Sequence, residues 1–146
     1  MEHSIIQWNV RSFQTNFKEL ALLSRRYKPA VFGLQETCLT NSKTPSFSGF
    51  NLLTKNSLND RATGGVALLI NKSYLFSEVH LNTTLQAVAA RVTLNKVVTF
   101  CSIYLPPSDH VAKTDLINLI EQLPSPFVLL GDINGHSPQQ QRTNVG

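Results

Sequence analysis

The sequence predicts an α/β protein in which single helices cover the outer faces of β-sheets. Short apolar runs outnumber the amphipathic helical segments, and the helical segments arrive one at a time between groups of strands. The chain has 146 residues, 42% of them hydrophobic and 15% charged, a balance that suits one domain with a real core. We therefore expect residues 1–146 to lie in a single domain with the architecture of a layered sandwich.

The first 35 residues predict a β-α-β unit. Residues 4–10 and 30–35 are apolar runs of strand length, and residues 16–27 between them carry apolar side chains at helical spacing. A unit of this size implies parallel strands joined by a right-handed crossover. The crossover would place Asn9 and Glu36, at the carboxyl ends of the two strands, on the same edge of the sheet.

The rest of the chain predicts mainly strands. Asn95-Lys96 is a tight turn that favours a hairpin, and Gly64-Gly65 precedes a strand instead of linking a strand to a helix. Because no phosphate-binding glycine motif is present either, a nucleotide-binding domain is not expected. The later strands and the second helix, which ends before Pro124, are expected at residues 50–54, 65–70, 77–80, 85–92, 97–104, about 111–123 (helix) and 127–130.

Bulk composition limits the possible partners without choosing one. The formal net charge of +4 permits a polyanionic partner, but the basic group at residues 25–28 is explained by a solvated helix end. Cys38 and Cys101 have no metal-binding or disulfide spacing, so we expect reduced, packed thiols. No apolar run approaches the length of a membrane span and no secretory signal is visible, so an intracellular protein is expected.

Polar residues follow several of the buried strands. They are Asn9, Glu36, Tyr104, and Asp132 with Asn134. Each alone also fits a turn or capping residue. Ligands in open α/β sheets collect at the carboxyl ends of strands, and several such positions together indicate a functional site.

The residue types suit metal-assisted hydrolysis of a phosphate ester. Glu36 and the amide oxygen of Asn9 offer the few hard oxygen ligands that Mg²⁺ accepts. Asp132, fixed by Asn134, could orient or deprotonate the attacking water. The Tyr104 hydroxyl could donate to a phosphate oxygen, and such positioning does most of the catalytic work in this chemistry.

Five short motifs occur in an order that is similar to a known family. They are Trp8-Asn9, Leu34 to Glu36, Gly64 to Ile70, Ile103 to Pro107 and Gly131 to Asn134. The sequence resembles the endonuclease/exonuclease/phosphatase superfamily, which includes pancreatic deoxyribonuclease and the apurinic-site repair endonucleases. Through YLPPSD, QLPSPFVLLGD and NGHSP it is most similar to the endonuclease domain of jockey-type non-LTR retrotransposons. The similarity covers essentially all 146 residues.

The resemblance implies a four-layer α/β sandwich and a Mg²⁺ or Mn²⁺ ion held by Asn9 and Glu36. It implies that Asp132 activates water beside Asn134 and that Tyr104 faces the phosphate. Arg11 departs from the repair-enzyme pattern, and its positive charge is expected to repel a metal and attract phosphate. Repair-enzyme relatives carry an acidic residue at the position of Arg11, which argues against apurinic-site repair. The implied partner is duplex DNA, nicked in the nucleus to expose a 3′ hydroxyl that primes reverse transcription.

The family completes its site with a late Ser-Asp-His segment that does not follow Asn134 here. The segment Ser108-Asp109-His110 matches these residue types, but it begins a predicted helix directly after the tyrosine loop, so we interpret it as a helix cap. His136 is interpreted as a turn residue. The chain is therefore expected to be the N-terminal portion of such a domain, with its C-terminal portion missing. We expect it to be marginally stable and weak or inactive as a nuclease.

Two alternative functions remain open from the sequence. One is a phosphoesterase that acts on a smaller phosphorylated substrate with the same core residues. The other is a non-catalytic remnant that keeps the first half of the fold and some affinity for polyanions.

Overall fold

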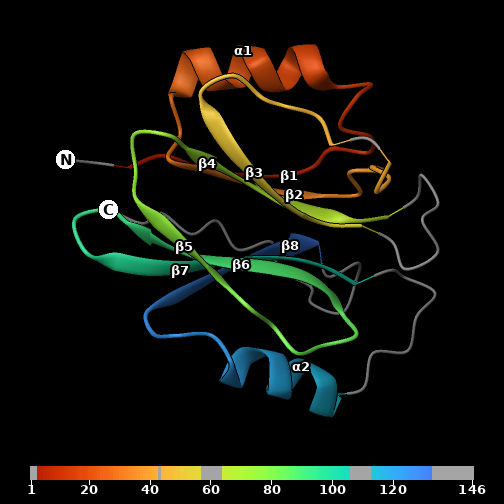
Figure 1. The fold of residues 1–146 in the computed structure, drawn as a ribbon, viewed down its shortest axis with the longest axis vertical. Helices are drawn as coiled ribbons and strands as arrows, with labels where there is room; N and C mark the ends of the chain where they lie inside the picture. The colour runs from red at the N-terminus through yellow and green to blue at the C-terminus, as the bar shows by residue number, and fades with distance from the viewer. Residues whose placement is uncertain (1–2, 43, 57–63, 106–112, 133–146) are drawn as a thin grey trace.

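The computed structural model describes residues 3–42, 44–56, 64–105 and 113–132, with Asp132 described by its backbone alone. These residues form four layers (Figure 1). One helix covers the outer face of a first four-stranded sheet, a second four-stranded sheet packs against the inner face, and another helix covers the far side. The predicted sandwich of two sheets between helices is confirmed.

The first sheet has the strand order β1-β2-β4-β3. Its strands are β1 (Ile5–Asn9), β2 (Val31–Gln35), β3 (Phe50–Lys55) and β4 (Val66–Asn71). The β1 and β2 strands are parallel, joined through α1 (Phe17–Tyr27), and their register pairs Asn9 with Gln35. The predicted β-α-β unit is therefore confirmed, and α1 ends in Lys28, whose left-handed backbone lets its N–H donate to Ser24 O at 2.9 Å.

The second sheet has the strand order β5-β6-β7-β8. Its strands are β5 (Phe76–Val79), β6 (Gln86–Thr93), β7 (Val97–Tyr104) and β8 (Phe127–Asp132). The predicted hairpin joins β6 to β7, closed by Leu94 N–H donating to Lys96 O at 2.9 Å. A second β-α-β unit follows, because α2 (Lys113–Glu121) connects β7 to a parallel β8.

One predicted boundary was wrong in a way that concerns the site. We expected the last strand to stop at residue 130 and Asp132 to lie in the turn beyond it. The strand continues through Asp132, because parallel pairing with β7 extends to the match of Tyr104 with Asp132. Gly131 lies inside the strand, paired with Ile103, and a side chain at this position would collide with the Ile103 carbonyl on β7.

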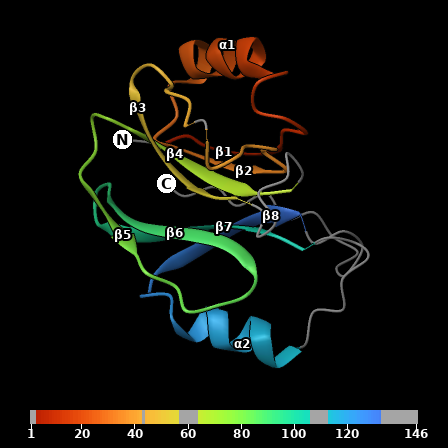
Figure 2. The same ribbon diagram turned by 45° about the vertical axis from the view of Figure 1, so that its right-hand side comes forward.

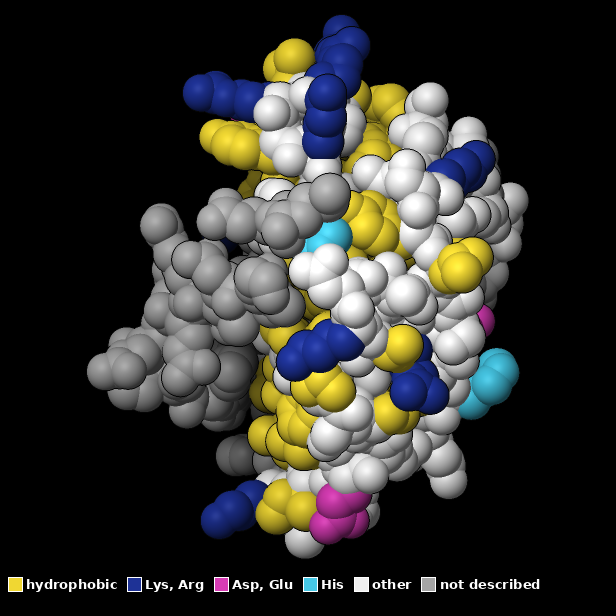
Figure 3. Space-filling model, turned by 90° about the vertical axis from the view of Figure 1, so that its left-hand side faces the viewer, with side chains coloured by type: hydrophobic (Ala, Val, Ile, Leu, Met, Phe, Trp, Pro, Cys, Tyr) yellow, Lys and Arg dark blue, Asp and Glu magenta, His cyan; other side chains and the backbone are white. Residues whose placement is uncertain are grey.

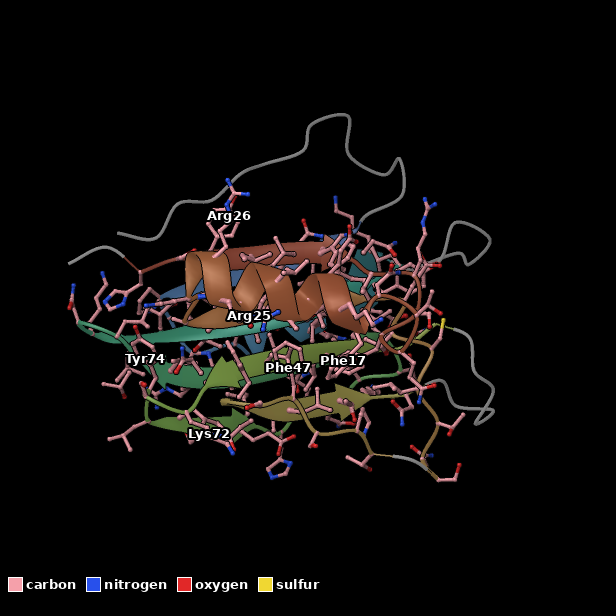
Figure 4. All side chains as sticks on the ribbon, turned by 90° about the horizontal axis from the view of Figure 1, so that it is seen from above. Phe17, Arg25, Arg26, Phe47, Lys72 and Tyr74 are labelled. Carbon is pink, nitrogen blue, oxygen red and sulfur yellow. The ribbon has the colours of Figure 1, made fainter. Side chains whose placement is uncertain are left out.

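The core has three parts that correspond to the contacts between layers. The layer under α1 is built on phenylalanines, with Phe47 in ring contact with Phe13, Phe17, Phe32 and Phe50 at centroid distances of 5.4 to 6.2 Å. Figure 4 shows Phe17 and Phe47 lying next to each other beside α1. Between the sheets lie aliphatic and aromatic side chains, and the α2 side is closed by a third cluster that includes Cys101 and Leu119.

The two sheets approach closely where β2 faces β8. A Cβ atom on Gly33 would stand 2.6 Å from Leu130 Cδ1 and 2.7 Å from Leu130 Cβ. Only a residue without a side chain lets the strands pack at this separation. Figure 2 shows β8 running below the first sheet at this level. The contact brings the carboxyl end of β2 near the carboxyl end of β8.

Candidate functional site

The carboxyl ends of four strands meet at one end of the sandwich. In the first sheet Asn9 ends β1 beside Gln35, which ends β2 and precedes Glu36. In the second sheet Tyr104 and Asp132 are register partners at the ends of β7 and β8. The two pairs belong to the same end of the molecule, because Gln35 Nε2 donates to Leu130 O at 3.2 Å across the sheets.

The segment after β1 stays beside the segment after β2. Val10 N–H donates to Gln35 O at 3.0 Å, Ser12 N–H to Glu36 O at 2.8 Å, and Phe13 N–H to Thr37 O at 2.9 Å. Arg11 lies within this clamped segment and is exposed to solvent. The backbone of the predicted phosphate-attracting residue, Arg11, is therefore held beside the backbone of the predicted metal-binding residue, Glu36.

Strained backbone gathers at this end of the sheet. Positive φ angles occur at Arg11 (47°), Ser12 (99°), Glu36 (51°) and Cys38 (55°), and elsewhere in the described residues only Lys28 and glycines have them. Each such non-glycine residue costs on the order of 1–2 kcal/mol. Strain of this kind persists where the surroundings fix the backbone, and it is concentrated at functional sites. Its position supports the assignment of a site to these strand ends.

Asn9 and Tyr104 face the interior between the sheets. Side chains alternate along β1, and Ile5 packs in the cluster between the sheets whereas Ile6 and Trp8 pack on the α1 side. Asn9 therefore shares the inner face with Ile5. Tyr104 is 8% exposed and belongs to the same inner cluster, so its side chain packs between the sheets at the end of β7.

Glu36 is partly exposed, and its charge acts on a neighbouring thiol. Burial raises the pKa of the Cys38 thiol, and the Glu36 carboxylate raises it further. Cys38 is only partly buried, so the expectation of a packed thiol holds less well for it than for Cys101, whose burial raises its pKa to about 12. Both cysteines are free, as expected.

Several predicted residues lie outside the described part of the chain. They are Asn134, His136 and the Ser108-Asp109-His110 segment, and the side chain of Asp132 is outside it as well. Their predicted roles, including that of Ser108 or Asp109 as a helix cap, stay predictions.

The donor atoms that are described suit a hard divalent cation. Among the described residues no three His, Cys, Asp or Glu side chains come together as they would in an all-protein metal cage. Mg²⁺ does not need one, because it retains several waters and is commonly held by one or two carboxylates. Glu36 with the Asn9 amide oxygen, at adjacent strand ends, matches that requirement.

Polar side chains that the sequence analysis did not single out tie the two sheets together at this end. Gly65 N–H donates to Gln86 Oε1 at 2.6 Å, and Lys55 Nζ donates to the carbonyls of Thr83 and Leu85 at 3.1 and 2.6 Å. Gln35 makes a third tie. The signal for Gln35 was available in the sequence, since it is a glutamine at the end of the apolar run VFGLQ.

Surface charge is uneven. Figure 3 shows Lys and Arg side chains at the α1 end of one face and at several places farther along it, whereas the acidic side chains visible there lie mainly toward the end away from α1. Arg25 and Arg26 belong to the last turn of α1, where cations interact favourably with the helix dipole. This agrees with their interpretation as a solvated helix end. Among the described residues no helix has the length and apolar character needed to cross a membrane.

Comparison with known proteins identifies the family. Residues 6–144 match the model of the Endonuclease/Exonuclease/phosphatase family. No curated protein matches the sequence.

Solved structures share the fold at low sequence identity. The endonuclease domain of TRAS1, a telomere-specific non-LTR retrotransposon, is 19% identical with a TM-score of 0.72 over 92% of this chain and 60% of that one. The 3′-5′ exonuclease NExo from Neisseria meningitidis is 20% identical with a TM-score of 0.69 over 89% and 57%. The Xenopus laevis APE2 catalytic domain is 16% identical with a TM-score of 0.60 over 97% and 62%. The chain thus spans about 60% of the length of these structures. With a family match over nearly its whole length and the expected two-sheet fold, this chain belongs to the endonuclease/exonuclease/phosphatase family.

Proposed function

We propose that this chain is part of a Mg²⁺-dependent DNA endonuclease, of the kind found in non-LTR retrotransposons, that nicks one strand of duplex DNA. The observation that carries the proposal is the meeting of Asn9, Glu36, Tyr104 and Asp132 positions at one end of the sandwich. If these were ordinary turn or capping residues, there would be no reason for positions on two different sheets to lie together. Four such positions at one end are what a phosphoesterase site needs.

Each residue has a role that follows from its chemistry. Glu36 and Asn9 would hold Mg²⁺, which supplies charge neutralisation at the phosphate when bound. The Asp132 carboxylate would accept a proton from the attacking water, with Asn134 orienting both. The Tyr104 hydroxyl would donate a hydrogen bond to a phosphate oxygen, and the exposed Arg11 guanidinium would attract the DNA backbone.

DNA is the substrate class best supported by the neighbours and by charge. The TRAS1 structure is an endonuclease domain, and NExo was also solved as a 3′ phosphatase bound to a product DNA hairpin. The net charge of +4 permits a polyanionic partner of this kind. A nuclear location and the priming of reverse transcription from the nicked 3′ end follow as part of the proposal. Because NExo was solved as a 3′ phosphatase, a terminal phosphate is the second candidate substrate.

The first test measures metal binding without requiring turnover. Thermal melting of the 146-residue chain with and without Mg²⁺ should show a higher melting temperature in Mg²⁺, because binding to the folded state stabilises it. Glu36→Gln should abolish the increase. Glu78→Gln is the matched control, since Glu78 is exposed on β5 at the edge of the second sheet far from β8. An increase that survives Glu36→Gln would place the metal elsewhere.

The second test measures chemistry. Conversion of supercoiled plasmid to the nicked form, expected to be weak in this chain, should occur in Mg²⁺ and not in EDTA, and Glu36→Gln and Asp132→Asn should each lower its rate by at least about a hundredfold. A hairpin with a 3′ phosphate, assayed in parallel, distinguishes nicking from phosphatase activity. Glu36-dependent metal binding with neither activity would support the remnant alternative. Metal binding that does not depend on Glu36, with no activity, would refute the proposal.

A further inference from the structure

Gln35 is a polar side chain in the closed interior between the two sheets. It ends β2 and is 0% exposed, and Ser102, which it contacts on β7, is also 0% exposed. Gln35 Nε2 donates to Ser102 Oγ at 3.1 Å and to Leu130 O on β8 at 3.2 Å. Its Oε1 accepts from Gln7 Nε2 on β1 at 2.7 Å. One side chain thus joins both sheets through four strands.

The side chains of Gln35 and Ser102 use most of their capacity to donate and accept hydrogen bonds. Gln35 donates through its amide twice and accepts once, and the Ser102 hydroxyl accepts from Gln35 while donating to Leu34 O at 2.8 Å. Ser102 therefore also reaches back to the first sheet. A buried polar group is favourable only when its hydrogen bonds are made, and the two buried members, Gln35 and Ser102, make theirs, whereas Gln7 on β1 is exposed. The network has the properties of a rigid connection between the sheets.

The connection lies directly beneath the predicted catalytic positions. Gln35 is followed by Glu36 and is the register partner of Asn9. Ser102 is two residues before Tyr104, and Leu130 is two residues before Asp132. Two residues along a strand span about 7 Å, so each anchor holds a strand just below the residue at its end.

Apolar contacts farther along the sandwich cannot set the spacing in the same way. The cluster between the sheets consists largely of aliphatic and aromatic side chains, which attract without preferring one direction. Hydrogen bonds prefer donor–acceptor distances within a few tenths of an ångström and narrow angles. The Gln35 network therefore fixes how the ends of β1 and β2 sit against the ends of β7 and β8, whereas the ties through Gln86 and Lys55 hold β4 and β3 against β6 and the segment before it.

We propose that Gln35 is a positioning residue, which with Ser102 sets the separation between the metal-binding half of the site (Asn9, Glu36) and the half that faces the phosphate and the water (Tyr104, Asp132). This rests on the proposed function. Removing the network should leave metal affinity nearly unchanged, because both metal ligands belong to the first sheet. It should lower turnover by roughly tenfold to a hundredfold, as expected when catalytic groups shift by about 1 Å.

The test measures the relation between the two halves without requiring turnover. Mn²⁺ serves as the probe metal, and the tyrosines are replaced by 3-fluorotyrosine in a Tyr27→Phe, Tyr74→Phe background that leaves Tyr104 as the only label. A metal held by Glu36 should broaden the Tyr104 fluorine resonance strongly, because paramagnetic broadening falls with the sixth power of distance. Glu36→Gln should remove the broadening.

The variants that decide the proposal are Gln35→Met, which keeps the length of the side chain, and Ser102→Ala, which deletes one buried oxygen atom. Thr99→Val is the control, a polar-to-apolar change at a buried position farther back on β7. We expect the first two to alter the broadening at unchanged Mn²⁺ affinity, and the control to alter neither.

The outcomes separate the two proposals. No broadening in the parent chain, or broadening that persists in Glu36→Gln, overturns the proposed metal site and this inference with it. Glu36-dependent broadening that is the same in Gln35→Met, Ser102→Ala and Thr99→Val overturns the positioning role alone. Should Gln35→Met fail to fold, Ser102→Ala decides the question, since the loss of a single hydroxyl leaves the surrounding apolar packing in place.

Discussion

Substituting Gly33 by alanine tests how tightly the two sheets are packed beneath the site. The new Cβ atom would stand 2.6 Å from Leu130 Cδ1 and 2.7 Å from Leu130 Cβ, so the neighbours must retreat by about 0.8 Å to reach an ordinary contact of 3.4 Å. Cδ1 can move by rotation, but Cβ moves only with the β8 backbone. Overpacking of this kind costs about 1–3 kcal/mol, and the better strand propensity of alanine returns about 0.5–1 kcal/mol. We expect a net loss of about 1–2 kcal/mol.

The assay is urea denaturation of the parent chain, Gly33→Ala, Leu130→Ala and the double variant. Leu130→Ala alone should cost about 2–5 kcal/mol, because it leaves a cavity at a position that is 6% exposed. The double variant should cost about 1 kcal/mol less than the sum of the single changes, because the Cγ and Cδ1 contacts of Leu130 with the new methyl group are gone while the Cβ contact at 2.7 Å remains. If the cost of the double variant equals the sum of the two single costs, or if Gly33→Ala is more stable than the parent, the packing described for β2 and β8 is refuted.

Three further changes probe separate parts of the structure. Burial raises the pKa of the Cys101 thiol from 9.0 to about 12, so the stability contributed by the protonated thiol is complete below pH 9 and is lost as pH rises toward 12. Between pH 8 and 10 the parent should lose about 1 kcal/mol more stability than Cys101→Ala in urea titrations. Phe47 is 4% exposed, so Phe47→Ala should lower the free energy of unfolding by about 3–5 kcal/mol in thermal or urea denaturation. Phe17 is 38% exposed, and Phe17→Ala should cost clearly less. Equal costs would contradict the central place of Phe47 in this cluster. Lys55→Met removes the donor to the carbonyls of Thr83 and Leu85 and should lower the free energy of unfolding by about 1 kcal/mol. The loss is modest because Lys55 is partly exposed. An unchanged urea midpoint would show that this tie contributes nothing to stability.

Most of the fold could be predicted because it depends on local rules. The alternation of apolar runs with amphipathic segments identified the strands and both helices, and the handedness of β-α-β units placed Asn9 and Glu36 at one edge. The same rule applies to β7, α2 and β8, so Tyr104 and Asp132 also share an edge. The end of β8 was missed because glycine at position 131 was interpreted as a turn, although parallel pairing with β7 requires a residue without a side chain there.

The parts that could not be predicted depend on contacts between distant segments. Gln35 and Ser102 are 67 residues apart in the chain, and neither position alone indicates that the other is its partner. The positive φ angles at Arg11 and Glu36 were also unforeseen, because neither residue type favours that conformation. They arise where the segments after β1 and β2 are held together by backbone hydrogen bonds, which is a property of the assembled edge.

The arrangement of the candidate site explains why its two halves must be tied together. The unit β1-α1-β2 supplies Asn9 and Glu36, and the unit β7-α2-β8 supplies Tyr104 and Asp132, so neither unit carries the whole set. Local folding can position the residues of one half with respect to each other, but only the packing of sheet on sheet can bring the halves together. A change that loosens this packing, such as Gly33→Ala, should therefore spare metal binding at Glu36 and weaken chemistry that needs both halves. Loss of metal affinity in Gly33→Ala beyond its loss of stability would mean that the metal site extends across both sheets.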